Sequence, residues 1–405
     1  MESKYFIKTC ALIATEGSSL SDDFEISGGN PNITYYESVK SPSISVSIDF
    51  IDVDGVISRE GITGGEYLDL KIKVPDFDDF EITPDKHFMM LNSVKNVKTS
   101  SNKQIATLEF ISVEAIINET ARVSRRFTGN VSQIVKELMK DKKSIQTSKN
   151  LETDESFNKY SFVGNLKRPF DTIQWLCPKA ASTDKECGFL FYENLDGYFF
   201  KSIKGLLESD SSETYEKPEA PVDTDIKITE NNLDSSNDIG MNCRMGMYAN
   251  KTIYVDIENG KLETVDYKIS DLNLAKPPKL PAGLEDTPTR LMLRILDAGA
   301  LQKGSKKEEV EKRSELAVYQ NKSYARTNLL FSQSLSISTP FNPDLRVGQM
   351  IDVVLPVKEG SDQSQTTGGG ENDISGKYLL SELKHSIANG KSNSELKLIR
   401  DVFTA

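Results

Sequence analysis

Short runs in which apolar and polar residues alternate occur at both ends of this 405-residue chain, and they constrain its fold more than any other feature. A period of two is typical of a strand that buries one face. In the first 115 residues the apolar positions are Ile44, Val46, Ile48 and Phe50, then Leu68, Leu70, Ile72 and Val74, then Ala106, Leu108 and Phe110. Near the end they are Leu335 and Ile337, Ile351, Val353 and Leu355, Tyr378 and Leu380, and Leu396 and Leu398. With glycine and aspartate turns between them, these runs favour two small antiparallel β-barrels or sandwiches.

The residues between the two β regions predict a mixture of helices and hairpins. Asn130 is a suitable N-cap for a helix that carries Val131, Ile134, Val135 and Leu138. A second helix is expected after Arg168, with Pro169 in its first turn and Pro178 near its end. Hairpins are predicted over 188–200 and across Asn259-Gly260, an extended exposed segment over 275–283, and a helix after the capping box at Ser305.

These patterns divide the chain into three regions and predict a β-rich α+β fold. Residues 1–115 form the first β-barrel domain, and residues 329–405 form the second. Residues 116–328 form a mixed α+β middle of one or two subdomains, with an acidic linker near 207–225. This middle region could also contribute a segment to the second barrel. Residues 359–372 cannot bury enough apolar surface to order themselves, so we expect a mobile loop that is dispensable for folding.

The composition argues against several classes of function. Asp and Glu number 61 against 49 Lys and Arg, and a net charge of −12 disfavours nucleic-acid binding through the overall field. Four cysteines do not make a disulfide framework. Two histidines, His87 and His385, leave little material for histidine catalysis. No apolar run reaches about 18 residues and no signal peptide is evident, so we expect no membrane span and synthesis in a cytosol.

The acidic clusters have simpler explanations than cation binding. Asp52 and Asp54 precede Gly55 as in part of a calcium loop, but Phe50 and Gly61 occupy the positions where such a loop needs acids. A hairpin turn is therefore favoured there. The aspartates at positions 76, 78 and 79 follow a strand end and are expected to form a solvated loop.

The candidate nucleophiles also favour structural roles. Cys177 and Cys187 are too widely spaced for a zinc pair, and Cys177 is expected to be a buried thiol. His385 is expected on the surface of the second barrel. We therefore predict no catalytic, cofactor-binding or metal-binding residues, no cofactor and no enzyme activity.

An aromatic hairpin invites two interpretations. Its members are Phe189, Phe191, Tyr192, Tyr198, Phe199 and Phe200. Because large aromatic side chains are mostly buried, a core role is favoured. An exposed set would instead be a surface for a sugar or peptide partner.

The stretch from Arg168 to Leu206 resembles the central module of baseplate hub proteins from contractile-tailed, T-even-like bacteriophages. It contains RPFDTIQWLCPKA followed by GFLFYENLDGYFFKSIKGL, in which Phe191-Tyr192-Glu193 and Asp196-Gly197 match the family hairpin. The C-terminal part follows the order of elements in such hubs, through residues 306–320, 335–339, Leu345-Arg346-Val347-Gly348, 351–355 and Gly376-Lys377-Tyr378. Spike proteins of type VI secretion share the same core fold.

The resemblance implies a structural role in the virion tail baseplate, assembled in the host cytoplasm. It implies a ring-forming homotrimer in which two similar barrels per chain adapt the sixfold tail tube to the threefold cell-puncturing spike. The implied partners are a separate trimeric needle or spike, a tail tube or tube-initiator protein, the tape measure protein and baseplate wedge proteins. DNA would pass through the ring without stable binding, and the acidic excess would line part of that channel or simply aid solubility.

Two alternatives remain open at this point. The first is a tail-associated glycan or peptide hydrolase that uses paired carboxylates, which requires a cleft with two acids at glycosidase separation. The second is a carbohydrate-binding adhesin, which requires the hairpin aromatics to form an exposed platform.

Overall fold

The protein is described by a computed structural model, in which strands outnumber helices and the main sheet is large and mostly antiparallel. The structure describes residues 5–26, 28, 31–53, 55–75, 77–99, 104–217, 228–235, 238–256, 260–272, 283–284, 286–295, 307–355 and 374–401. The expected loop over 359–372, the extended segment over 275–282 and the capping serine at position 305 lie outside these residues. In the described part, no helix is both long and apolar enough to cross a membrane.

The first β region holds eight strands and a short helix. Its elements are β1 (Phe6–Ile13), β2 (Phe24–Glu25), β3 (Asn32–Ser38), β4 (Ser45–Asp52), α1 (Val56–Glu60), β5 (Tyr67–Lys73), β6 (Phe80–Ile82), β7 (Met89–Thr99) and β8 (Gln104–Ser112). The three alternating runs of the sequence coincide with β4, β5 and β8, as predicted.

The next residues form the mixed middle. They comprise α2 (Val113–Thr120), β9 (Arg126–Asn130), α3 (Val131–Lys140), β10 (Leu151–Thr153), β11 (Lys159–Val163), α4 (Pro169–Leu176), the 3-10 helix η2 (Cys177–Lys179), β12 (Phe189–Asn194), β13 (Gly197–Ser202) and α5 (Ile203–Leu207). Asn130 and Gln133 form a capping box on α3, and Pro169 opens α4, which changes to a 3-10 turn at Pro178. The predicted helices and the predicted hairpin over 188–200 are therefore confirmed.

The second β region is interrupted by a small domain-like insertion. Its strands are β14 (Ser211–Glu216), β15 (Glu230–Ser235), β19 (Gln333–Pro340), β20 (Met350–Val354), β21 (Gly376–Ala388) and β22 (Lys391–Arg400). Between β15 and β19 lie α6 (Ile239–Met245), the three-stranded sheet of β16 (Ala249–Asp256), β17 (Lys261–Lys268) and β18 (Arg290–Ile295), the 3-10 helix η3 (Ile269–Asp271) and α8 (Lys307–Leu330). The pairing of β16 with β17 confirms the second predicted hairpin.

The linker expected over 207–225 instead contains a strand. Residues 211–216 form β14, which pairs with β20 of the C-terminal region. Tyr215 supplies the reason, because its ring is buried in the same core as Ile351 and Val353. The acidic composition of the segment predicted a linker, and the single buried side chain of Tyr215 was too weak a signal to predict the strand.

Both β regions place six strands in the same order across the sheet. We call β1, β3, β4, β5, β7 and β8 the first module, and β14, β15, β19, β20, β21 and β22 the second module. If the six strands of a module are numbered in chain order, their order across the sheet is 2-3-6-5-4-1 in both modules. In the first module this order is β3-β4-β8-β7-β5-β1, and in the second it is β15-β19-β22-β21-β20-β14. Neighbouring strands within the modules are antiparallel, except that β14 runs parallel to β20 whereas β1 runs antiparallel to β5. The expected similarity of the two β modules is confirmed in strand order once β14 and β15, which lie outside the expected range 329–405, are counted with the second module. Strand directions also agree for all but the first strand.

The modules are not two separate closed barrels, which corrects our expectation. No pairing joins the first and second strands of either module in the described part of the chain, so each sheet stays open. Instead β3 pairs with β21, from Ile33 opposite Ile387 to Ser38 opposite Glu382, and one 14-stranded sheet results. A period of two fixes which face of a strand is buried but not which strand lies beside it, so the alternation could not reveal this pairing.

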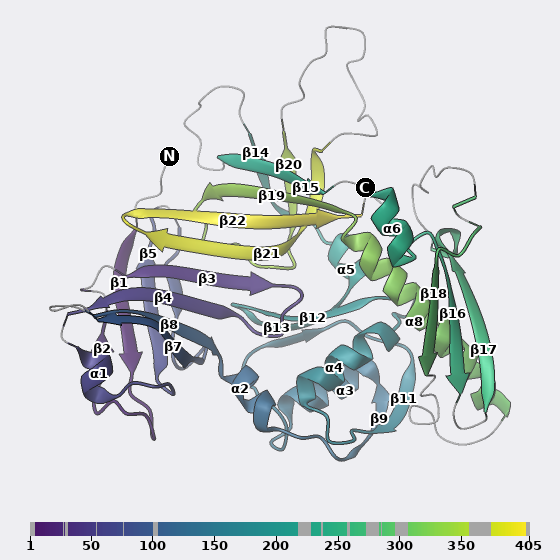
Figure 1. Cartoon of the computed structure of the whole chain (residues 1–405), viewed down its shortest axis with the longest axis horizontal. Coiled ribbons are helices and arrows are strands. Elements are labelled where there is room, and N and C mark those ends of the chain that lie inside the picture. Colours follow the sequence, from purple (N-terminus) through teal and green to yellow (C-terminus); the bar gives the residue numbers. More distant parts are fainter. Residues whose placement is uncertain are drawn as a thin grey trace, which may run out of the picture.

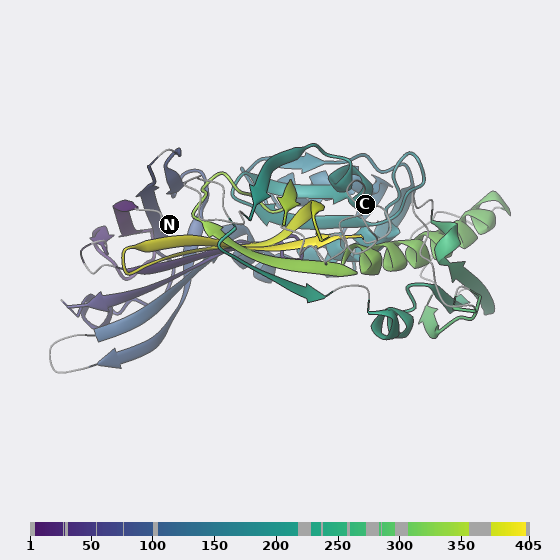
Figure 2. The same ribbon diagram turned by 90° about the horizontal axis from the view of Figure 1, so that it is seen from above.

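Each module buries its apolar face and leaves the opposite face polar. The first core contains Ile33, Val46, Ile48, Leu70 and Phe110, and the second contains Leu335, Ile337, Val353, Leu380 and Leu398. Figure 1 shows β22, β21, β3, β4 and β8 as one band beside the mixed middle. From above, β7 and β8 extend at one end of the molecule, and α8 with the small β16–β18 sheet lies at the other (Figure 2).

Candidate functional site

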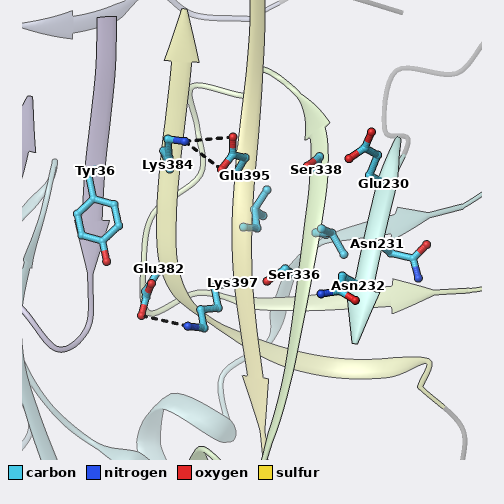
Figure 3. A pocket seen from close by; sticks show the side chains of 12 residues that line it. Tyr36, Glu230, Asn231, Asn232, Ser336, Ser338, Glu382, Lys384, Glu395 and Lys397 are labelled. Carbon is cyan, nitrogen blue, oxygen red and sulfur yellow. Dashed lines mark hydrogen bonds and ion pairs between the residues drawn. The ribbon is translucent and has the colours of Figure 1, made fainter. Parts of the chain in front are cut away.

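The polar face of the long sheet is the first candidate functional surface. Serines, threonines and charged side chains occupy most solvent-facing positions of β4, β8, β19, β21 and β22, and Ile51, Ile105 and Ile111 are apolar exceptions on β4 and β8. Over the second module this face forms an open depression of about 490 Å³, which also reaches Tyr36 of β3 and Glu230 of β15 (Figure 3). Its lining is hydrophilic and spread over five strands, so it is a broad surface rather than a ligand pocket.

Carboxylates and basic side chains are interspersed on this face. Lys384 lies 3.1 Å from Glu395, and Lys397 lies 3.8 Å from Glu382, as Figure 3 shows. A similar pair joins Lys95 to Glu109 on the first module. Further carboxylates on the face are Asp49, Glu230 and Asp234. The surface therefore carries charges of both signs, several of them in ion pairs.

A buried glutamate joins the two modules behind this face. Glu37 of β3 is completely buried, and its Oε1 accepts a hydrogen bond from the backbone N–H of Leu195 at 2.8 Å. Its Oε2 accepts one from the backbone N–H of Val347 at 2.9 Å, and the Tyr35 hydroxyl also donates to the carboxylate. One side chain thus connects the first module, the tip of the β12–β13 hairpin and the second module.

A second buried carboxylate ties the same hairpin to the first module. Glu193 of β12 accepts hydrogen bonds from the backbone N–H of Ile44 at 3.0 Å and from the Ser112 hydroxyl at 2.6 Å. The ammonium of Lys149 lies 2.7 Å from Glu193 and 2.9 Å from Glu114. Burial lowers the pKa of Lys149, but the two carboxylates raise it by more.

The hairpin tip also holds the turn that precedes β20. The Asn194 amide donates to the carbonyl oxygen of Val347 at 3.3 Å, and Arg346 forms an ion pair with Asp196 at 3.3 Å. Gly348 packs directly against the Tyr192 ring. The hairpin and turn motifs that resemble those of hub proteins therefore contact each other. Their pairing across about 150 residues could not be read from spacing, because nothing in either motif identifies its partner.

Glu37 should make the stability of this junction depend on pH. Burial raises its pKa to about 7, although Arg346 and the three hydrogen bonds counteract part of that effect. Because an unfolded glutamate has a pKa of about 4.3, the folded protein holds this proton more tightly. We expect the contribution of Glu37 to be fully present near pH 4 and to fall by about 3 kcal/mol as the pH rises through 7. Urea unfolding from pH 4 to 8 should show this slope in the wild type and lose it in Glu37→Gln; an equal slope in both proteins would contradict the assignment.

The aromatic hairpin is core, as favoured from the sequence. Its rings are mostly buried, and they divide between two cores. Phe189, Phe191, Tyr198 and Phe200 pack into the core of the mixed middle, whereas Tyr192 packs into that of the second module. An exposed aromatic platform, which the adhesin alternative requires, is not formed by this hairpin.

The acidic clusters are structural where they are described. The carboxylate of Asp52 accepts hydrogen bonds from the first two backbone N–H groups of α1 at 3.0 and 2.9 Å, so the expected hairpin turn is the start of a short helix. Asp79 forms an ion pair with Lys8 at 2.6 Å. Asp54 and Asp76 lie outside the described residues. Within the described ranges, no three His, Cys, Asp or Glu side chains gather into a metal-binding group.

His385 is buried, which corrects the expectation of a surface histidine. It shares a face of β21 with Leu383 and Ile387, so its ring turns into the core and lies 4.7 Å from the ring of Phe341. Burial lowers its pKa to about 3, and the ring is therefore neutral.

The two candidate cysteines, Cys177 and Cys187, lie in buried, unreactive environments. Cys177 is buried, as predicted, and so is Cys187. Burial raises the pKa of each thiol to about 12, so neither supplies a thiolate nucleophile near neutral pH.

An apolar patch on the small β16–β18 sheet is a second exposed surface. Leu291, Leu293 and Ile295 of the edge strand β18 are between 65% and 73% exposed. The β16 residue Val255 lies between Ile295 and Leu262 in the ladder, and Leu262 is also exposed. Contiguous exposed apolar side chains of this kind are typical of protein-binding surfaces.

Comparison with known proteins places the fold. No protein-family model matches the sequence, and no curated protein matches it. Among solved structures, the tail protein from Neisseria meningitidis MC58 aligns with 99% of this chain and 98% of its own, at a TM-score of 0.53 and 10% identity. The 43 kDa tail protein of prophage MuSo2 from Shewanella oneidensis aligns with 98% of this chain and 99% of its own, at a TM-score of 0.51 and 9% identity. The Escherichia coli c3393 protein, a type VI secretion component similar to the T4 tail proteins gp27 and gp5, aligns at a TM-score of 0.46 and 10% identity over 99% of this chain and 78% of its own.

The first two alignments extend over almost the whole of each chain. They therefore relate the complete arrangement of two modules and mixed middle, rather than a single shared sheet. The resemblance is confirmed at the level of the overall fold: this chain has the fold of phage-type tail proteins.

Proposed function

We propose that this protein is the structural hub of a phage tail baseplate. The observation that carries the proposal is the repeated strand order of the two modules within one chain. Three copies would present six similar modules, which matches a sixfold tail tube, while the other end keeps the threefold symmetry of a spike. The fold shared with two tail proteins supports a structural role rather than an enzymatic one.

The polar sheet face suits the inner wall of the ring. The opposite face is apolar and packs into the buried cores of the two modules, so the polar face is the one left to meet water in a channel. If the acidic excess of the whole chain extends to the channel of the ring, it would repel phosphate and let DNA pass without holding it. A lumen that proved neutral or positive in the assembled ring would contradict this part of the proposal.

The proposed partners follow from this position in the virion. A separate trimeric needle or spike would bind the threefold end, and a tail tube or tube-initiator protein would bind the sixfold end. Tape measure and wedge proteins complete the proposed contacts. The exposed Leu291, Leu293 and Ile295 support assembly with another protein surface, since soluble monomers rarely leave such a patch uncovered. Residues 1–115, 116–328 and 329–405 are proposed as the working units, with β14 and β15 serving the last.

The state of assembly tests the proposal. Mass photometry of the full chain should show a species of three times the 45.1 kDa chain mass, alone or on addition of the candidate needle protein. A chain that stays monomeric in both conditions would contradict the hub assignment. A dimer or tetramer would also contradict it, because neither supplies six modules.

A further inference from the structure

Two strand edges of the long sheet have no partner within the described part of the chain. β15 ends the sheet on one side, since it pairs only with β19. On the other side, β7 pairs with β5 only through Met90 and Tyr67, so its edge beyond Ser93 is unpaired. Unpaired edges of this length are templates for adding another strand.

These two edges are equivalent to the two strands that already join the modules. β15 is the second strand of its module, as β3 is of the first, and β7 is the fifth strand, as β21 is. β21 pairs with β20 up to Leu379, shifts register between Leu380 and Glu382, and then pairs with β3. β7 shifts register at the same point, between Leu91 and Ser93, directly after its single pair with β5. The chain therefore contains one complete junction and the two separate halves of a second.

We propose that β15 of one copy pairs antiparallel with β7 of the next copy and repeats the β3–β21 junction between chains. This rests on the proposed trimer and specifies its contact. The shared bulge aligns Lys384 of β21 with Lys95 of β7. The ladders through β19 and β4 align Tyr36 of β3 with the β15 bulge of Asp234 and Ser235, because Ser235 lies opposite Ser334 as Tyr36 lies opposite Ser45. Since Lys384 lies opposite Tyr36, Lys95 of one copy should lie opposite this bulge in the next copy, where Asp234 supplies an exposed carboxylate.

The chemistry of the two edges is complementary. The free part of β7 carries Lys95 and Lys98, and β15 carries Glu230 and Asp234. All four residues are exposed in the single chain. Opposite charges across a strand pair stabilise it, whereas two copies of β15, or two copies of β7, would place like charges together. The charges therefore favour head-to-tail closure of a ring over a two-fold dimer.

Cysteine cross-linking tests the pairing directly. In the double variant Lys95→Cys with Asp234→Cys, mild oxidation should convert the full chain into covalent trimers on non-reducing gels. Within one chain the two positions lie seven strands apart at about 4.8 Å per strand, which is beyond the reach of a disulfide. Each single variant should remain unlinked, and Lys95→Cys with Glu230→Cys, four residues out of register, should link at least tenfold less.

The outcomes separate this inference from the proposed hub. A protein that is trimeric by mass photometry but does not cross-link through positions 95 and 234 would overturn the β15–β7 contact and leave the trimer intact. Equal linking of the in-register and out-of-register pairs would also overturn it. A protein that remains monomeric would overturn the hub proposal itself.

Discussion

Replacing Lys149 by methionine should destabilise the protein by about 3–5 kcal/mol, because it leaves two buried carboxylates without their cation. The side chains of Lys149, Glu193 and Glu114 are at most 6% exposed. Burial already raises the pKa of Glu193, and loss of the ammonium raises it further, so the variant must bind a proton to stay folded at neutral pH. Urea unfolding at pH 7.5 should show the loss, and the deficit should shrink at pH 5.

The matched control is another lysine paired with a carboxylate at the surface. Lys384 lies on the polar face with 42% of its side chain exposed, beside Glu395 at 46%. Surface pairs of this kind contribute less than about 1 kcal/mol, so Lys384→Met should change stability little. An equal loss of stability in Lys149→Met and Lys384→Met would show that the buried cluster stabilises the protein no more than a surface ion pair does.

Replacing Gly348 by alanine should be the second most damaging single change, at about 2–5 kcal/mol. Its φ of 91° is a conformation that a side chain disfavours, and a Cβ there would collide with the hydroxyl of Tyr192. The collision would push the β20 turn away from the hairpin tip that holds both modules. Thermal melts of the purified variant would measure the loss, and adding Tyr192→Phe should recover part of it by removing the clashing oxygen.

A second glycine separates strain from collision. Gly390 has a similar φ of 79°, but no atom lies within 4 Å of the position its Cβ would take. Gly390→Ala should therefore lower the free energy of unfolding only through backbone strain, by about 1 kcal/mol. If both variants lose the same stability, the contact between Gly348 and Tyr192 does not matter.

Local patterns predicted most elements of this fold because they depend on neighbours in the chain. The alternation around Ile48 and Leu70 identified strands, and Asn130 and Pro169 marked helix starts. The expectation of two separate barrels was wrong for the opposite reason, because it depended on pairing between distant strands. Pairing of β3 with β21 joins residues about 350 apart, and a strand pattern carries no record of its neighbour.

The buried charges at the junction were the part of the site that sequence reasoning missed. Glu37 lies in the polar run Tyr36-Glu37-Ser38 and is indistinguishable there from a surface glutamate. Only its contacts with Leu195 and Val347, 158 and 310 residues away, show why a carboxylate is needed. The prediction for His385 was wrong for a similar reason. Its neighbours Lys384 and Ser386 face solvent, but side chains alternate between the two faces of a strand, so His385 points into the core.

Electron microscopy of the purified full chain tests the central claim most directly. We predict end-on averages with threefold symmetry in which six similar densities surround an open channel, with the polar sheet face lining it. At higher resolution, β15 of each copy should continue into β7 of the next. Particles without a channel, or rings in which the two modules of a chain occupy unlike positions around the axis, would contradict the account.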